Sequence, residues 1–208
     1  MLVHGGLWRD EWTRDTTESL AVALAERGWA TWNLEYRRVG RGGGWPESFE
    51  DIARALEAAE RLTGIPPDRT AVVGHSAGGT MALWSAGAAK VRPAMVVGLA
   101  AITDLERAAT DGLGEGAVSR LLGRARPDPA DLSPLHRLPN PVPAVLLQAA
   151  DDGLVPADYG AEYAAHAAAA GSPTGLQTVA GGHLSLLEPS GEHFEHLVRS
   201  LDAHCPAV

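Results

Sequence analysis

Ser76 lies between two glycines in residues 74–78, which read Gly-His-Ser-Ala-Gly. This stretch joins an apolar run to a helical pattern, so the chain must turn sharply from a strand into a helix. Glycines on both sides let the two backbones approach closely and leave the hydroxyl at the tip of the turn. The pattern is typical of a nucleophile elbow and predicts that Ser76 attacks a carbonyl carbon.

A serine hydroxyl is a weak nucleophile unless a base takes its proton, and an imidazole works best when a carboxylate fixes its tautomer. Two downstream loops carry these groups. Asp151 and Asp152 follow one apolar run, and His183 follows a later run and a glycine pair. The carboxyl ends of parallel strands meet at one edge of a sheet, so we expect an aspartate and His183 to lie beside Ser76.

The elements that must position these residues follow an α/β rhythm. Apolar, β-prone runs alternate with longer helical patterns, which indicates a mostly parallel, twisted sheet with helices on both faces. Strands are predicted at residues 1–4, 30–35, 70–74, 94–100, 142–149 and 176–179, and helices at residues 16–27, 48–62, 78–88, 157–169 and 191–203. Ser48 is expected to cap its helix at the N-terminus, whereas Gly28 and Gly64 are expected to end theirs.

Residues 103–141 interrupt this rhythm. They contain a short helical pattern at residues 115–122 and then five prolines, which exclude a strand. Because the segment joins two strands at the edge that carries Ser76, it is placed to cover a site, and we interpret it as a lid or cap. An ordered surface excursion is the alternative. No repeat or long linker is present, so the 208 residues are expected to form a single domain.

The composition excludes several classes of partner. A net charge of −9 gives no attraction to nucleic acid or to an anionic membrane, but it is compatible with a small-molecule substrate. The chain has neither a stretch long enough for a membrane span nor a signal-peptide pattern, which favours a cytoplasmic location. Its single cysteine, Cys205, allows no intrachain disulfide. The oligomeric state is left open.

The order Ser, Asp, His resembles that of the α/β-hydrolases, and the resemblance runs from Leu2 to about Leu201. In that family the acid usually lies in an Asp-x-x-Val-Pro stretch, which residues 152–156 match, so the resemblance assigns Asp152, with Asp151 as the fallback. It also implies that His183, in a glycine-rich loop after the last strand, is the base. The family's first two strands have no counterpart here, which suggests that they are missing.

An oxyanion hole requires backbone N–H groups aimed at the developing negative oxygen. The family places a His-Gly-Gly motif after its third strand, and His4, Gly5 and Gly6 match it. The resemblance implies that Gly6 or Gly5 donates one hydrogen bond and that Ala77, after the nucleophile, donates the second. A simple strand-ending turn is the alternative for residues 4–6.

Residues 4–8, which read His-Gly-Gly-Leu-Trp, are similar to a small-esterase branch that includes arylformamidases. Residues 35–37 (Glu-Tyr-Arg), the Trp45–Pro46 pair and Asp51 add to this resemblance. It implies hydrolysis of a small ester or an N-formyl amide, with no cofactor, and Trp8 and Trp45 are candidates for lining the substrate pocket.

An oligopeptidase-like hydrolase shares the fold and the triad, but it generally has an extra domain. A non-catalytic binding protein is a third reading, against which the complete triad argues.

The other histidines carry weaker signals. His193 and His196 are three residues apart on a predicted helix, a spacing that a metal pair also shows, but no second ligand cluster accompanies them. A solvated helix face is therefore expected, and no metal. His75 precedes the nucleophile, and we expect its side chain to point away from the reacting centre, without a catalytic role.

Overall fold

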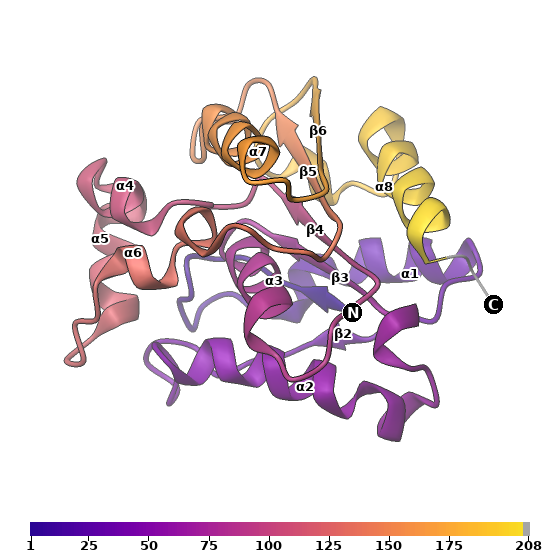
Figure 1. Cartoon of the computed structure of the whole chain (residues 1–208), viewed down its shortest axis with the longest axis horizontal. Helices are drawn as coiled ribbons and strands as arrows, with labels where there is room; N and C mark the ends of the chain where they lie inside the picture. The colour runs from indigo at the N-terminus through magenta and orange to yellow at the C-terminus, as the bar shows by residue number, and fades with distance from the viewer. Residues whose placement is uncertain (206–208) are drawn as a thin grey trace.

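The structure is a computed structural model that describes residues 1–205. Its centre is a six-stranded sheet in which all neighbouring strands are parallel (Figure 1). The strands are β1 (Leu2–Val3), β2 (Asn33–Leu34), β3 (Ala71–His75), β4 (Met95–Leu99), β5 (Ala144–Ala149) and β6 (Thr174–Val179). Their order across the sheet is β2-β1-β3-β4-β5-β6, and each overlaps a run predicted from the sequence. The predicted α/β class is confirmed.

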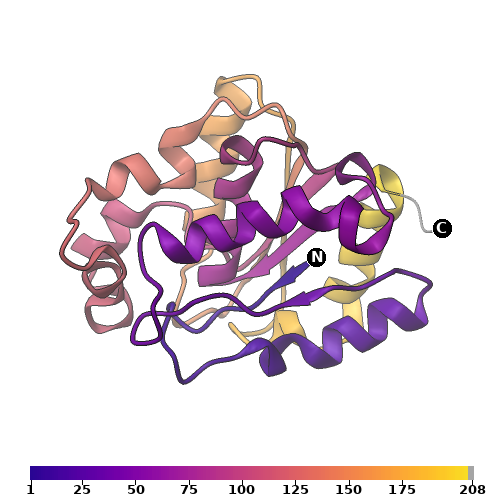
Figure 2. The same cartoon turned by 90° about the horizontal axis from the view of Figure 1, so that it is seen from below.

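Helices cover both faces of the sheet, as the two views in Figures 1 and 2 show. One face carries α2 (Glu47–Thr63), α3 (Ala77–Ala88) and α7 (Asp158–Ala169), and the other carries α1 (Glu18–Glu26) and α8 (Gly191–His204). Short 3-10 helices lie at η1 (Arg14–Thr17), η2 (Pro67–Arg69) and η4 (Ser185–Leu187).

The central strands are apolar at nearly every position because both of their faces are covered. In β3, Val72 packs into the cluster under α2 and α3, whereas Val73 packs into the cluster under α1 and α8. Leu146 and Leu147 of β5 divide between the two clusters in the same way. A continuous apolar run is therefore the sequence pattern of these buried strands.

The predicted helix ends are partly right. The helix α2 begins one residue earlier than predicted, so Ser48 lies inside it and is not its N-cap. The Ser48 hydroxyl instead donates to the carbonyl of Arg37 and accepts the N–H of Gly44, which fixes the loop before the helix. Gly64 ends α2 in the left-handed region with φ 75°, as predicted, and Gly28 follows α1 with φ 91°.

Residues 103–141 fold into short helices that lie together at one end of the molecule (Figure 1). These are α4 (Leu105–Thr110), α5 (Leu113–Leu122), α6 (Pro129–Leu132) and the 3-10 helix η3 (Pro134–Arg137). Arg107 joins α4 to α7, since it donates to Asp158 at 2.8 Å and to Glu162 at 3.1 Å and lies 4.2 Å from the centroid of the Tyr159 ring. The segment is thus anchored to the sheet domain, and its motion as a lid stays a prediction.

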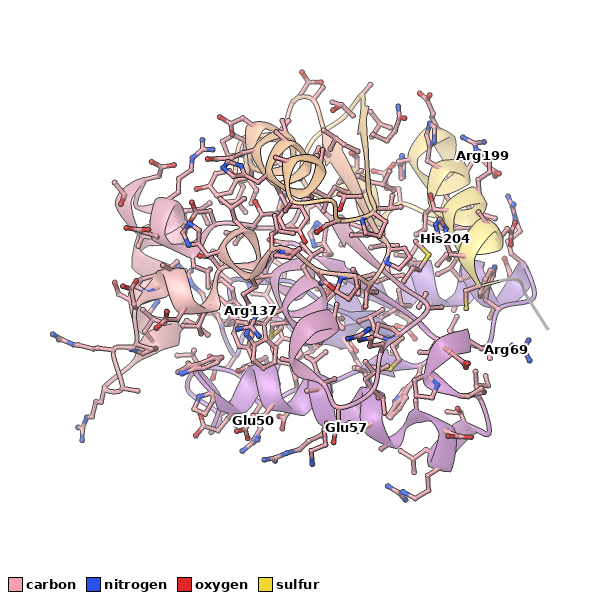
Figure 3. The ribbon with its side chains drawn as sticks, in the orientation of Figure 1. Glu50, Glu57, Arg69, Arg137, Arg199 and His204 are labelled. Atoms are coloured by element: carbon pink, nitrogen blue, oxygen red, sulfur yellow. The ribbon has the colours of Figure 1, made fainter. Side chains whose placement is uncertain are left out.

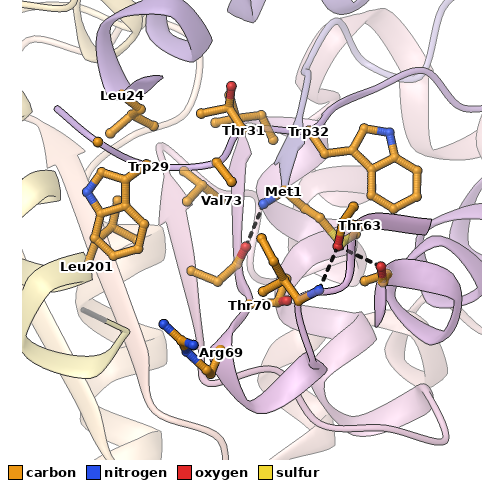
Figure 4. Close-up of a pocket in the computed structure, with 16 residues that line it drawn as sticks. Met1, Leu24, Trp29, Thr31, Trp32, Thr63, Arg69, Thr70, Val73 and Leu201 are labelled. Atoms are coloured by element: carbon orange, nitrogen blue, oxygen red, sulfur yellow. Dashed lines mark hydrogen bonds between the residues drawn. The ribbon is translucent and has the colours of Figure 1, made fainter. Parts of the chain in front are cut away.

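A mostly apolar groove lies at the amino ends of the strands (Figure 4). Trp29, Trp32 and Leu201 line it, and the N-terminal ammonium of Met1 donates to the carbonyl of Ala71 at 2.8 Å beside it. Loops that follow parallel strands lie at the opposite, carboxyl edge of the sheet. None of the predicted site residues lines this groove.

Charged side chains project from the outer faces of the helices. Glu50 and Glu57 lie on the outward side of α2, and Arg199 lies on α8 (Figure 3). Among residues 1–205, no helix is both long enough and apolar enough to cross a membrane.

Candidate active site

Ser76 occupies the sharp turn that the sequence predicts. The strand β3 ends at His75, α3 begins at Ala77, and Ser76 between them has φ 53° and ψ −122°. A side chain in this region costs on the order of 1–3 kcal/mol, which the surrounding structure must offset. A methyl group at Gly78 would lie 2.2 Å from the carbonyl oxygen of Val3, so only glycine lets α3 start this close to β1.

Asp152 and His183 meet at the same edge of the sheet. His183 Nδ1 lies 2.7 Å from Asp152 Oδ2, and the Asp152 side chain has no exposed surface. The other carboxylate oxygen accepts the N–H groups of Leu154 and Val155, each at 2.8 Å. All the hydrogen bonds to Asp152 thus hold the carboxylate in place and present one oxygen to the imidazole.

Asp151 is arranged differently from its neighbour. Its side chain is exposed, and its backbone N–H donates to the carbonyl of Gly181 at 2.9 Å. This contact ties the loop after β5 to the loop that carries His183. The geometry therefore favours Asp152 over Asp151 as the partner of the imidazole.

The imidazole of His183 lies next to the elbow. Its ring centroid is 4.6 Å from that of His75, the residue before Ser76. Within residues 1–205 no hydrogen bond joins the Ser76 hydroxyl to this imidazole; catalytic hydrogen bonds in unliganded sites are often long and tighten when substrate binds. Ser76 is 1% exposed and the His183 side chain 12%, so the site meets solvent on the His183 side.

The expectation that His75 points away from the reacting centre is wrong. Its ring packs against His183, and its Nε2 lies 3.0 Å from the carbonyl oxygen of that residue. Burial, and next the charge of His183, lowers the pKa of His75 to about 4. A local rule about the elbow missed this contact because it depends on a loop 108 residues further along the chain.

This low pKa predicts a pH-dependent stability. The ordinary pKa of histidine is about 6.5, and that of folded His75 is about 4. Between pH 6.5 and pH 4 the unfolded chain therefore binds a proton at His75 that the folded chain does not. Stability should therefore fall as the pH is lowered through this window, by about 3 kcal/mol in all. Urea unfolding of wild type and His75→Gln at several pH values tests this, with exposed His136→Gln as the control. Equal pH slopes for wild type and His75→Gln would contradict it.

The glycines of the predicted oxyanion hole are held by a buried network around His4. Both ring nitrogens of His4 face acceptors: Nδ1 lies 2.8 Å from the carbonyl of Gly5, and Nε2 lies 2.9 Å from Glu35 Oε1. The ring stacks on Tyr36 with 4.3 Å between centroids, and the Tyr36 hydroxyl donates to the carbonyl of His4 at 3.1 Å. Burial raises the Glu35 pKa, but the hydrogen bond from His4 and that from the backbone of Arg14 outweigh it and lower the pKa.

This network sets the direction of the peptide groups. The N–H of a trans peptide points opposite to its carbonyl, so fixing the carbonyl of Gly5 toward His4 turns the N–H of Gly6 the other way. A methyl group at Gly5 would lie 3.0 Å from the Ser76 Cβ, which brings this loop against the elbow. Ala77 is the first residue of α3, and its N–H therefore has no intrahelical acceptor. The Ala77 N–H is thus free beside Ser76, and the Gly6 N–H stays the predicted second donor.

Gly5→Ala tests the close fit of this loop. The added methyl group would lie 2.9 Å from the carbonyl oxygen of His75 and 3.0 Å from its Nδ1, so the loop must shift, and with it the N–H of Gly6, the predicted oxyanion donor. We expect kcat/KM for ester hydrolysis to fall about a hundredfold, the usual effect of losing one such donor. Gly87→Ala on α3, where the methyl group meets open space, is the matched control. Activity of Gly5→Ala within about twofold of wild type would contradict the assignment of this loop to the active site.

Of the two predicted pocket tryptophans, Trp8 lies in the core and Trp45 packs against it. Trp8 has no exposed surface, and Trp45 is half-buried with its ring against Phe49 and Trp84. A pocket role for either stays a prediction. Trp12, in contrast, is 46% exposed, and its Cβ lies 2.3 Å from where a side chain on Gly6 would begin. Trp12 thus borders residues 4–6, the loop with the predicted oxyanion donor (the oxyanion loop). Its place there was not predicted from the sequence, although it lies only a few residues after the His-Gly-Gly motif.

His193 and His196 each have protein partners on or near their own helix. His193 Nε2 lies 2.7 Å from the carbonyl of Glu188, and His196 Nε2 lies 3.3 Å from Glu192. Within the described residues no group of three or more histidine, cysteine, aspartate and glutamate side chains is arranged to hold a metal ion.

Solved structures of hydrolases share this architecture. An acetyl ester-xyloside bifunctional hydrolase from Caldicellulosiruptor lactoaceticus superposes with a TM-score of 0.79 and 24% identity over 97% of this chain and 80% of its own. A hormone-sensitive lipase from a metagenome library gives 0.80 and 23% over 99% and 75%. Esterase B from Lactobacillus rhamnosis gives 0.83 and 16% over 98% and 74%. At these identities the likeness establishes the α/β-hydrolase fold.

Comparison of sequences identifies the family. No curated protein matches the chain. Residues 18–197, in contrast, match the model of the prolyl oligopeptidase family, and this range includes Ser76, Asp152 and His183. It also includes five of the six strands, from β2 to β6. The match spans well over half of the chain, which therefore belongs to the prolyl oligopeptidase family and has its α/β-hydrolase fold.

Proposed function

We propose that this protein is a serine hydrolase that cleaves small esters or activated amides through an acyl-enzyme on Ser76. The observation that carries the proposal is the Asp152–His183 hydrogen bond of 2.7 Å at the sheet edge where the elbow ends. A carboxylate held in this way fixes the imidazole with a hydrogen on Nδ1 and leaves Nε2 free to accept the serine proton.

In the first step Ser76 Oγ attacks the substrate carbonyl while its proton passes to His183 Nε2. The electron pair of the carbonyl moves onto oxygen, where the N–H groups of Gly6 and Ala77 stabilise it. The tetrahedral intermediate then collapses, and the leaving group departs with the proton from His183. Water then attacks the acyl carbonyl while His183 Nε2 takes its proton. When the bond between the acyl carbon and Ser76 Oγ breaks, His183 returns the proton to Ser76 and the acid is released.

The surface of the site favours an apolar or aromatic group on the substrate. Six large apolar side chains are exposed among the described residues, and three of them come shortly after site residues in the sequence. Leu154 follows Asp152, Leu184 follows His183, and Trp12 follows the His-Gly-Gly motif. Exposed leucines are common on protein surfaces, but a half-exposed tryptophan against the oxyanion loop offers an aromatic leaving group a ring to stack on. Two of the similar structures are described as hydrolases of esters or as an esterase, which agrees with this substrate class.

A peptidase is the second candidate, because the matched family is described as prolyl oligopeptidases. An arylformamidase is the third, from the resemblance of residues 4–8. One panel separates the three: p-nitrophenyl acetate and butyrate, N-formylkynurenine, and a proline-containing peptide p-nitroanilide. We expect the highest kcat/KM for a short acyl ester, and a Trp12→Ala variant should raise KM for aromatic leaving groups more than for ethyl esters. Cleavage of the peptide p-nitroanilide and of no other substrate in the panel would show that the enzyme is a peptidase.

A further inference from the structure

We propose that His75 is a positioning residue, whose imidazole holds the loop that carries His183 against the elbow that carries Ser76. The inference rests on the proposed hydrolase function, since it concerns how the base reaches the nucleophile. His75 Nε2 lies 3.0 Å from the carbonyl oxygen of His183, and His75 is buried, with 4% of its surface exposed.

The chemistry of this contact defines the tautomer. A carbonyl oxygen only accepts, so His75 Nε2 must carry the hydrogen and Nδ1 must carry a lone pair when the ring is neutral. The pKa lowered to about 4 by burial keeps the ring neutral near pH 7. Neutrality matters because His183 becomes an imidazolium during the reaction, and a second positive ring 4.6 Å away would oppose that charge.

The ring of His75 also lies beside Gly5. Its Nδ1 would be 3.0 Å from a methyl group built there, and the ring packs on the tilted ring of His183. One buried ring thus lies between the elbow, the oxyanion loop and the loop of the base. His183 and Asp152 are the charged groups that act on it electrostatically.

Holding the carbonyl of His183 restricts rotation of the backbone on which the imidazole is mounted. The side chain itself is held at Nδ1 by Asp152, 2.7 Å away. Two anchors, one on the backbone and one on the ring, restrict the positions that the imidazole can take and hold it next to the elbow. Loss of the backbone anchor should therefore lower kcat and leave substrate binding largely unchanged.

Two variants separate positioning from packing. His75→Phe fills the space of the ring but has no N–H to donate, whereas the amide nitrogen of His75→Gln reaches about as far as Nε2 and donates. For p-nitrophenyl acetate we expect kcat of His75→Phe to fall about a hundredfold, as for a misplaced catalytic group, with KM within about threefold of wild type. His75→Gln should keep kcat within about fivefold. Equal losses in the two variants, or no loss in His75→Phe, would overturn the proposal.

A second readout does not depend on turnover. Nitrogen-15 NMR of histidine-labelled wild type reports the tautomer, and we expect His75 to be neutral with its hydrogen on Nε2 from about pH 5 to 8. A hydrogen on Nδ1, or titration near the ordinary histidine pKa, would overturn the proposal even in an enzyme inactive toward the chosen esters. Absence of hydrolysis by wild type, with no labelling of Ser76 by a fluorophosphonate, would instead contradict the hydrolase function.

Discussion

Replacement of Ser76 by alanine is expected to lower kcat/KM for p-nitrophenyl acetate by about ten-thousandfold or more. The variant retains the oxyanion N–H groups and the base, but no atom remains to form the acyl-enzyme. Because alanine keeps a Cβ at this strained turn and removes only the hydroxyl, the fold should be preserved. Steady-state kinetics with a melting curve for each protein provides the measurement.

Ser85→Ala is the matched control for this substitution. Ser85 is a second buried serine and lies within α3. Its hydroxyl donates to the carbonyl of Ala82 in the same helix. We expect this variant to hydrolyse the ester at the wild-type rate. Near-normal hydrolysis by Ser76→Ala in a preparation free of other esterases would contradict the assignment of the nucleophile.

Asp152→Asn should have the second-largest effect, a loss in kcat of roughly a thousandfold or more. The amide keeps the shape of the carboxylate, and its oxygen still fits the N–H groups of Leu154 and Val155, which donate to Oδ1 at 2.8 Å. Its NH₂ group then faces His183 Nδ1 and favours the tautomer with hydrogen on Nε2, which cannot accept the serine proton. Kinetics of the variant on the same ester measures this loss.

The adjacent aspartate supplies the comparison. Asp151 is exposed and contributes its backbone N–H, not its carboxylate, to the contact with Gly181. Asp151→Asn should therefore keep kcat within about twofold of wild type. A large loss in Asp151→Asn together with a small one in Asp152→Asn would reverse the assignment of the acid.

The fold could be predicted from the sequence because its signals are local. The central strands β3, β4 and β5 are apolar runs between turn residues, and the glycines of residues 74–78 mark the change from strand to helix. This motif predicts the sharp turn at Ser76. A parallel sheet accounts for an aspartate and His183 lying at one edge, whereas the choice of Asp152 over Asp151 came from the resemblance to α/β-hydrolases.

What the sequence could not show depends on contacts between distant loops. The contact of His75 with His183 spans 108 residues, and no periodicity reports it. The same holds for His4 and Glu35, whose hydrogen bond forms only when β1 and β2 pair. Ser48 was misassigned as a cap because a tertiary contact with Arg37 competes for its hydroxyl. Exposure of Trp12 and burial of Trp8 likewise depend on how the loop folds.

Covalent acylation of the Ser76 hydroxyl is the central step of the proposed reaction. The most direct test is to treat the purified chain with a fluorophosphonate and to locate the modification by peptide mass spectrometry, with and without excess short-chain ester. We expect a single adduct on Ser76 that the ester suppresses and that is absent in His183→Ala. An unmodified Ser76, or an adduct on another residue in an active preparation, would contradict it.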